Sequence, residues 1–297
     1  MSASRVEALL LAALKGLPPK PADSVPPAAK KRYSELMSAA IALALAEELR
    51  ERGMPEARPA PPGEVGASGA ERRLAGGIGA KKVDVTWATE ESGLLLGMSV
   101  KSINFKDGKT KNFQKNLTNR RADMLIEAVT LHRRFPYAVL CGLFFLDSGA
   151  ATDQTATRRS TAINAHQRLR LFTGRSDPAG RDEQFERLYL ILVDANPFTP
   201  TYTVHEVGSP TAEIDLDTAL DQVVDLVAER NFDFYESING SIYKLSARAA
   251  RGVSTAGESV TDPLVELDDH ADDQADPEGA DDLDDAEAFE GQGDDEA

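Results

Sequence analysis

Asp84 and Lys101 are the two residues whose types and spacing point most directly to chemistry. Asp84 lies near the start of one short apolar run and Lys101 lies in the next run. Because side chains alternate between the two faces of a strand, we expect Ser99 and Lys101 to point one way, and Met98 and Val100 the other. A metal-binding carboxylate opposite a lysine of this kind is the arrangement that phosphodiester-cleaving enzymes need.

The two runs that carry these residues predict a β-hairpin. They cover residues 81–87 and 94–101, both are apolar and alternating, and residues 88–93 join them. Runs of this length with a short polar connection are typical of paired antiparallel strands. The second strand is expected to continue towards Phe105.

Helices and strands are predicted to alternate around the hairpin. A short helix is expected from Ser68, with Glu71 three residues later in the position of a capping box. Apolar residues at helical spacing predict a helix over residues 117–134. The almost wholly apolar residues 137–146 predict a strand buried on both faces. The remaining expected elements are a basic helix (156–172), two strands (185–194 and 201–207) and a helix (216–230).

The two ends of the chain differ from its middle. Residues 4–15 and 28–52 predict helices, and the proline-rich stretches beside them indicate an appendage loosely tied to the rest of the chain. The acidic C-terminal end predicts disorder. The expected organisation is N-terminal helices and linkers (1–63), an α/β domain with a mixed central sheet flanked by helices (64–251), and a disordered acidic tail (252–297).

The net charge of -16 is unevenly distributed along the chain. From Glu258 to the end there are 18 acidic residues and no Lys or Arg, so the remaining 31 acidic residues face all 33 basic ones. Within residues 101–175, 14 Lys or Arg stand against 5 Asp or Glu. The middle of the chain is therefore basic, and the acidity belongs to the tail.

The order helix, hairpin with Asp and x-Lys, helix and buried strand resembles the PD-(D/E)xK nuclease superfamily, over about residues 64–147. The resemblance implies a restriction-endonuclease-like fold, with Asp84 as a ligand of Mg²⁺ and Lys101 as the motif lysine that positions or activates the attacking water. Two positions depart from the pattern. Val83 replaces a frequent proline that makes no chemical contribution, and Ser99 replaces the second carboxylate.

The triplet Ser99-Val100-Lys101 is similar to a variant in which a later helix supplies the displaced acid. That resemblance implies a second metal ligand at Asp123 or Glu127, which lie one helical turn apart on one face. Glu71 is a third candidate. The competing interpretation makes Asp84 a turn residue, Glu71 a capping residue, and the two helix acids surface partners of nearby arginines.

A basic and amide-rich stretch between the hairpin and the next helix predicts nucleic-acid binding. Lys and Arg neutralise phosphates, and Asn side chains can bond phosphates or base edges. The alternative is a solvated loop that only keeps the protein soluble. The candidate residues are Lys106, Lys109, Lys111, Lys115, Asn116, Asn119, Arg120 and Arg121.

These observations lead us to expect a Mg²⁺-dependent endonuclease that acts on double-stranded DNA in restriction or anti-phage defence. RNA as the substrate stays open, as do a homodimer and a partner protein for the acidic tail. The alternative function is a non-catalytic nucleic-acid-binding or scaffold protein that retains the nuclease fold. The single cysteine, Cys141, and the lack of a membrane-spanning run favour a cytoplasmic protein without a membrane partner.

Overall fold

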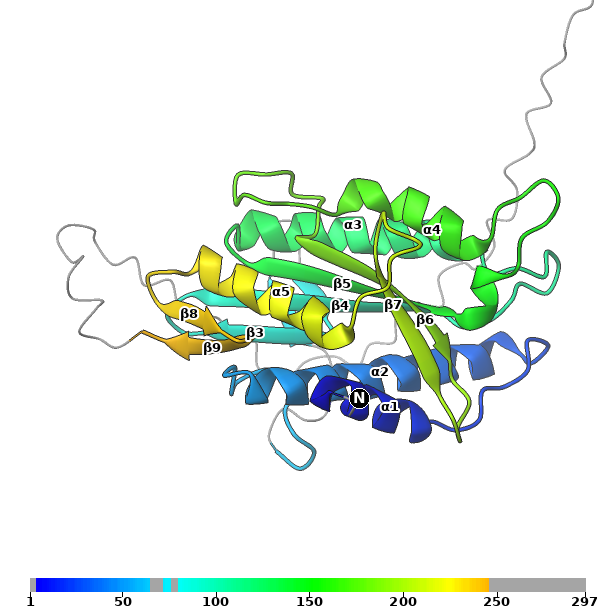
Figure 1. Ribbon diagram of the computed structural model, residues 1–297, viewed down its shortest axis with the longest axis horizontal. Coiled ribbons are helices and arrows are strands. Elements are labelled where there is room, and N and C mark those ends of the chain that lie inside the picture. Colours follow the sequence, from blue (N-terminus) through cyan, green and yellow to red (C-terminus); the bar gives the residue numbers. More distant parts are fainter. Residues whose placement is uncertain (1–3, 65–71, 76–79, 246–297) are drawn as a thin grey trace, which may run out of the picture. The chain divides into compact units, whose positions relative to one another are not determined.

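A five-stranded mixed sheet forms the centre of the computed structural model, which describes residues 4–64, 72–75 and 80–245 (Figure 1). Its two outer strand pairs are antiparallel, and its two inner pairs are parallel. The predicted α/β class with a mixed sheet and flanking helices is thus confirmed. The strand order is β3 (Val85–Thr89), β4 (Gly93–Ile103), β5 (Val139–Asp147), β6 (Arg187–Asp194) and β7 (Thr201–Glu206).

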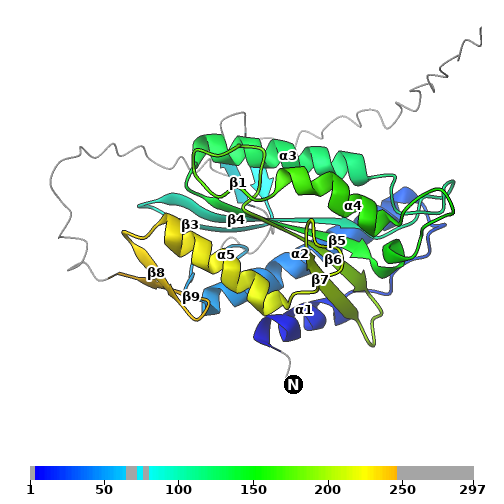
Figure 2. The same ribbon diagram turned by 45° about the horizontal axis from the view of Figure 1, so that its top comes forward.

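Helices cover both faces of this sheet, as the two views show (Figures 1 and 2). One face carries α3 (Leu117–Arg134) and α4 (Thr161–Leu169), and the other carries α1 (Arg5–Lys15), α2 (Pro27–Glu51) and α5 (Leu216–Arg230). Two hydrophobic clusters fill the two interfaces, and alternate residues of each strand contribute to one or the other.

The hairpin forms as expected, but its first strand is interrupted at Asp84. Residues Ala80–Val83 form β2, which pairs with β1 (Arg72–Ala75) in a separate two-stranded sheet. Strand β3 begins only after Asp84 and pairs with β4. A helix was expected to begin at Ser68, but residues Arg72–Ala75 form strand β1 and are not part of a helix. Ser68 and Glu71 themselves lie outside the described residues.

The N-terminal helices are an integral part of the fold, which corrects the prediction of a loosely tied appendage over residues 1–63. Leu10 and Leu14 of α1 and Leu45 of α2 belong to the same buried cluster as Trp87 of β3. Most of this contact comes from residues far apart in the sequence, so local patterns do not reveal it. The predicted disorder of residues 252–297 falls outside the described part of the chain.

A buried arginine strengthens the attachment of α2. Arg52 lies just after this helix, and its guanidinium contacts Glu48 at 2.8 Å and Asp217 and Asp221 of α5 at 2.5 Å each. Arg52 also donates to the carbonyl of Gly240 at 2.9 Å. Helices from the two ends of the described chain are therefore joined directly.

Short backbone pairings lie along both outer edges of the central sheet. At β3, Arg58 and Thr86 exchange two backbone hydrogen bonds of 2.8 and 3.1 Å. At β7, the N–H of Ile214 donates to the carbonyl of Val204 at 3.0 Å. After α5 the chain forms a small hairpin that the sequence did not predict, β8 (Tyr235–Ile238) and β9 (Ser241–Lys244).

The other predicted elements differ from the structure mainly at their ends. The basic helix is shorter than residues 156–172, because Ser160 caps the start of α4 and a 3-10 turn follows its end. The helix predicted over residues 216–230 coincides with α5. None of the helices that the structure describes is long and apolar enough to cross a membrane.

Candidate active site

The interruption before β3 holds the Asp84 carboxylate against the neighbouring strand. The backbone N–H of Val100 donates to Asp84 Oδ2 at 2.7 Å. A carboxylate that accepts from a backbone N–H of the facing strand has a fixed position relative to that strand. Asp84 is therefore held beside the stretch of β4 that carries Ser99 and Lys101.

The alternation predicted for β4 is confirmed. Met98 and Val100 lie in the cluster beneath α1, α2 and α5. Ser99 and Lys101 contact a side chain of α3, which lies on the opposite face of the sheet. The strand therefore presents one hydroxyl and one ammonium group to the helix that follows it.

The Lys101 ammonium group contacts two carboxylates. Its Nζ lies 3.8 Å from Asp84 Oδ2 and 3.2 Å from Glu127 Oε2. Ser99 Oγ donates to the same Glu127 oxygen at 3.2 Å. The structure thus brings together four of the residues singled out in the sequence, and Glu127 reaches the position next to Ser99 where the second carboxylate was missing.

Burial shapes the electrostatics of this cluster. The side chain of Glu127 is 4% exposed. Burial raises its pKa and outweighs the opposing charge of Lys101, and the charge of Asp84 adds a smaller increase. Burial alone would lower the pKa of Lys101, but the charges of Glu127 and Asp84 outweigh it and raise this pKa. Lys101 therefore favours its charged form.

Helix α3 directs Glu127 inward through its own apolar pattern. Met124, Glu127, Ala128 and Leu131 are all buried, and their spacing of three and four residues places them on the face towards the sheet. A buried carboxylate needs a partner, and Ser99 and Lys101 provide it.

Asp123, the alternative on the same helix, is not part of this contact set. Its side chain is 49% exposed, and it pairs with Arg120 at 3.5 Å. Its charge nevertheless contributes to the raised pKa of Lys101, so Asp123 lies near the cluster but outside it. Glu71, the third candidate, cannot be placed because it lies outside the described residues.

Asp84 and Glu127 suit a hard divalent cation such as Mg²⁺. This ion binds through oxygen and commonly takes only one or two protein carboxylates, with water in its other positions. Asp84 and Glu127 both contact Lys101, so two carboxylates lie at one place and can serve as the protein ligands of such an ion. Asp84 and Glu127 are therefore the candidate ligands. Over residues 4–64, 72–75 and 80–245, no three His, Cys, Asp or Glu side chains gather in a group that could hold a metal.

The predicted nucleic-acid-binding residues extend from the end of β4 into the first turns of α3. Asp107 shapes the lysine-rich loop by accepting the N–H groups of Thr110 and Lys109 at 2.7 and 3.0 Å, and these bonds lower its pKa to about 2. Lys109 and Lys111 are exposed, and Lys115 pairs with Asp107 at 3.5 Å.

Aromatic rings hold two of the other cations in place. Lys106 lies over Phe113 at 5.6 Å, and Arg121 lies over Phe172 at 5.8 Å. A polar hollow of about 450 Å³ opens beside the first turns of α3. It is lined by Asn116, Asn119, Arg120, Ala122 and Asp123.

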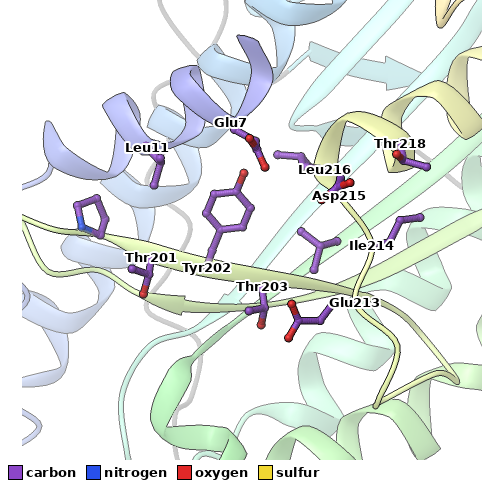
Figure 3. Close-up of a pocket in the computed structure, with 12 residues that line it drawn as sticks. Glu7, Leu11, Thr201, Tyr202, Thr203, Glu213, Ile214, Asp215, Leu216 and Thr218 are labelled. Atoms are coloured by element: carbon purple, nitrogen blue, oxygen red, sulfur yellow. The ribbon is translucent and has the colours of Figure 1, made fainter. Parts of the chain in front are cut away.

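A second hollow, of about 540 Å³, lies between α1, β7 and the start of α5 (Figure 3). Its lining includes Glu7, Glu213 and Asp215, and Tyr202 points from β7 towards α1. Three carboxylates disfavour a phosphate-bearing ligand by like-charge repulsion. This hollow belongs to the face opposite α3, so it is separate from the Lys101 cluster.

Comparison of the chain with protein-family models, with curated proteins and with solved structures found no match in any of the three.

Proposed function

We propose that this protein is a Mg²⁺-dependent endodeoxyribonuclease with a restriction-endonuclease-like core. The observation that carries the proposal is the contact of Lys101 Nζ with both Asp84 and Glu127, at 3.8 and 3.2 Å. A hairpin followed by α3 and the parallel strand β5 supports the proposed fold.

In this mechanism Asp84 and Glu127 would hold the cation. When bound, Mg²⁺ would supply Lewis-acid stabilisation of the charge that develops on the attacked phosphate. Ser99 keeps Glu127 oriented through their 3.2 Å hydrogen bond. The two carboxylates are thereby fixed from two elements, the hairpin and α3.

Lys101 acts through its charge. In the metal-free protein the charges of Glu127 and Asp84 raise the pKa of Lys101, so the side chain is an ammonium group at neutral pH. An ammonium group can donate hydrogen bonds to an attacking water and to a phosphate oxygen, and so position both. The proposed role of Lys101 is therefore positioning and charge stabilisation.

The basic stretch from Lys106 to Arg121 supports a polyanionic substrate. Its exposed lysines lie between β4, which carries Lys101, and α3, which carries Glu127. Phosphate contacts of this kind supply affinity that depends on salt but not on sequence. Double-stranded DNA is the proposed substrate, and a role in restriction or anti-phage defence stays a prediction.

Cleavage of supercoiled plasmid in Mg²⁺, with a chelator control, tests this proposal. Asp84→Ala, Lys101→Ala and Glu127→Ala are each expected to lose cleavage. Glu183→Gln, a carboxylate outside the cluster that pairs with Arg181, is the matched control and should retain most of it. Equal cleavage by the wild type and all four variants would refute the assignment.

The second candidate is a non-catalytic nucleic-acid-binding or scaffold protein. Ser99 at the position of a carboxylate favours this function. It predicts DNA binding that weakens with salt, without cleavage in Mg²⁺ or any other divalent cation. Mg²⁺-dependent cleavage that Asp84→Ala abolishes would exclude it.

A further inference from the structure

The hollow at the first turns of α3 contains polar groups that the fold itself does not use. Asn116 and Asn119 are exposed, and their side-chain amides make no hydrogen bond within the described part of the chain. Arg120 lines the same hollow. Amide N–H groups and a guanidinium group are donors that match phosphate oxygens.

The ion pair of Arg120 can be exchanged for a ligand. Arg120 Nη1 lies 3.5 Å from Asp123 Oδ2, and the two side chains are 43% and 49% exposed. An ion pair between two half-exposed side chains is weak because water screens it. A phosphate group can bind a guanidinium group through two parallel hydrogen bonds, so it competes effectively with Asp123 for Arg120.

The hollow lies next to the candidate active site. Asp123 on its wall is one helical turn before Glu127 on α3. A ligand in the hollow would thus lie close to the phosphate that Lys101 would contact in the proposed function, without occupying the same place.

Contacts of α3 with α4 and with the 3-10 turn that follows it fix the position of the hollow. Arg168 of α4 donates to Thr118 Oγ1 at 3.2 Å, and Arg121 lies over the ring of Phe172. The first turns of α3 are therefore anchored before any ligand arrives. Such preorganisation lowers the entropic cost of binding.

We propose that this hollow is a phosphate subsite, in which Arg120, Asn116 and Asn119 bind one backbone phosphate of the substrate strand beside the scissile phosphate. This inference rests on the proposed function, and it adds that the substrate must be a polynucleotide with a phosphate on that side of the cut. A simple phosphodiester would not fill the subsite.

The test measures DNA binding separately from cleavage. The full-length protein is titrated with a fluorescent 20-base-pair duplex in chelator over a range of salt concentrations. Arg120→Ala should reduce the slope of log affinity against log salt by about 0.9, the contribution of one phosphate contact. Arg134→Ala, which removes an exposed arginine from the opposite end of α3, should leave the slope unchanged.

Duplexes with one neutral methylphosphonate linkage identify the phosphate. Among the linkage positions that weaken binding by the wild-type protein, one should have no effect on binding by Arg120→Ala. The subsite is refuted, while DNA binding stands, if Arg120→Ala shows the same salt dependence of affinity as the wild type and is weakened by the same methylphosphonate linkages. Absence of DNA binding in all variants would refute the proposed function and the subsite together.

Discussion

Glu186 and Arg175 form an ion pair in which neither side chain is exposed to solvent, with Arg175 Nη1 3.1 Å from Glu186 Oε1. Glu186 also contacts Arg230 at 2.8 Å and His132 Nε2 at 3.3 Å, and it accepts the N–H of Leu140 at 2.7 Å. One carboxylate thus joins the ends of α3 and α5 to the start of β5. This network stabilises the end of the sheet where β5 begins.

Replacing Glu186 should destabilise the protein strongly. Glu186→Gln leaves two buried guanidinium groups without a counter-charge, which costs about 3 to 5 kcal/mol. Urea unfolding followed by circular dichroism measures this loss. Glu183→Gln is the control, because Glu183 pairs with Arg181, which is 71% exposed, and it should change the free energy of unfolding by less than about 1 kcal/mol. Similar stabilities of the two variants would contradict the role given to Glu186.

The stability of the protein should fall in mild acid because of a buried histidine. Burial, together with the charge of His205, lowers the pKa of His166 from 6.5 to about 4. Between these values the unfolded chain binds a proton that the folded chain does not, so the free energy of unfolding falls as the pH falls, by up to about 1.4 kcal/mol per pH unit.

His166→Gln should remove this dependence. As the pH falls from 6.5 to 4, the wild type should lose unfolding free energy through His166, and the variant should not because it has no imidazole at this position. The difference in unfolding free energy between the two proteins should therefore narrow. Urea titrations at four pH values measure it. Curves for the two proteins that stay parallel over the whole range would show that His166 is not responsible.

Loss of a leucine in α1 should destabilise the sheet as well as the helix. Leu14 is fully buried in the cluster that contains Trp87, the single tryptophan. Leu14→Ala should cost about 2 to 5 kcal/mol, and the Trp87 fluorescence should report it as a lower urea midpoint. Leu36→Ala, at a position that is 42% exposed, serves as the control. An unchanged Trp87 midpoint in Leu14→Ala would indicate that the N-terminal helices unfold separately.

An exchange of side chains tests whether Glu127 supplies the carboxylate that Ser99 lacks. Loss of a group that only supports a metal ligand lowers activity by up to about 100-fold. Glu127 is proposed to be a ligand itself, so Glu127→Ala should lower the cleavage rate by at least that factor. Ser99→Asp alone should destabilise the protein, because it adds a second buried carboxylate beside Glu127. The double variant Ser99→Asp/Glu127→Ala should recover part of the Mg²⁺-dependent activity, as measured on plasmid DNA. A double variant as inactive as Glu127→Ala would contradict this geometry.

The candidate site could be predicted largely because its residues lie on elements with strong local patterns. The alternation in β4 predicted that Ser99 and Lys101 share a face, and the structure confirms it. The predicted bounds of α3, residues 117–134, are also confirmed. The choice between Asp123 and Glu127 depended on the rotation of α3 about its axis. The spacing of Met124, Glu127 and Leu131 contained that information, since it places Glu127 within the apolar stripe.

Features that depend on distant contacts could not be predicted. The break at Asp84 depends on its hydrogen bond to Val100 on the other strand. The attachment of α2 depends on Arg52 meeting two carboxylates about 165 residues later, at Asp217 and Asp221. Neither contact leaves a periodic signal in the sequence, so the proline-rich stretches beside the helices indicated a loosely tied appendage.

The backbone pairings at Arg58 and Ile214 limit how two copies of this protein can associate. Open edge strands are the usual route by which sheets join end to end or aggregate. Here a second copy that added a strand at β3 or β7 would have to displace hydrogen bonds of 2.8 to 3.1 Å that the chain already makes with itself. These pairings therefore oppose the addition of an intermolecular strand at Thr86 of β3 or Val204 of β7.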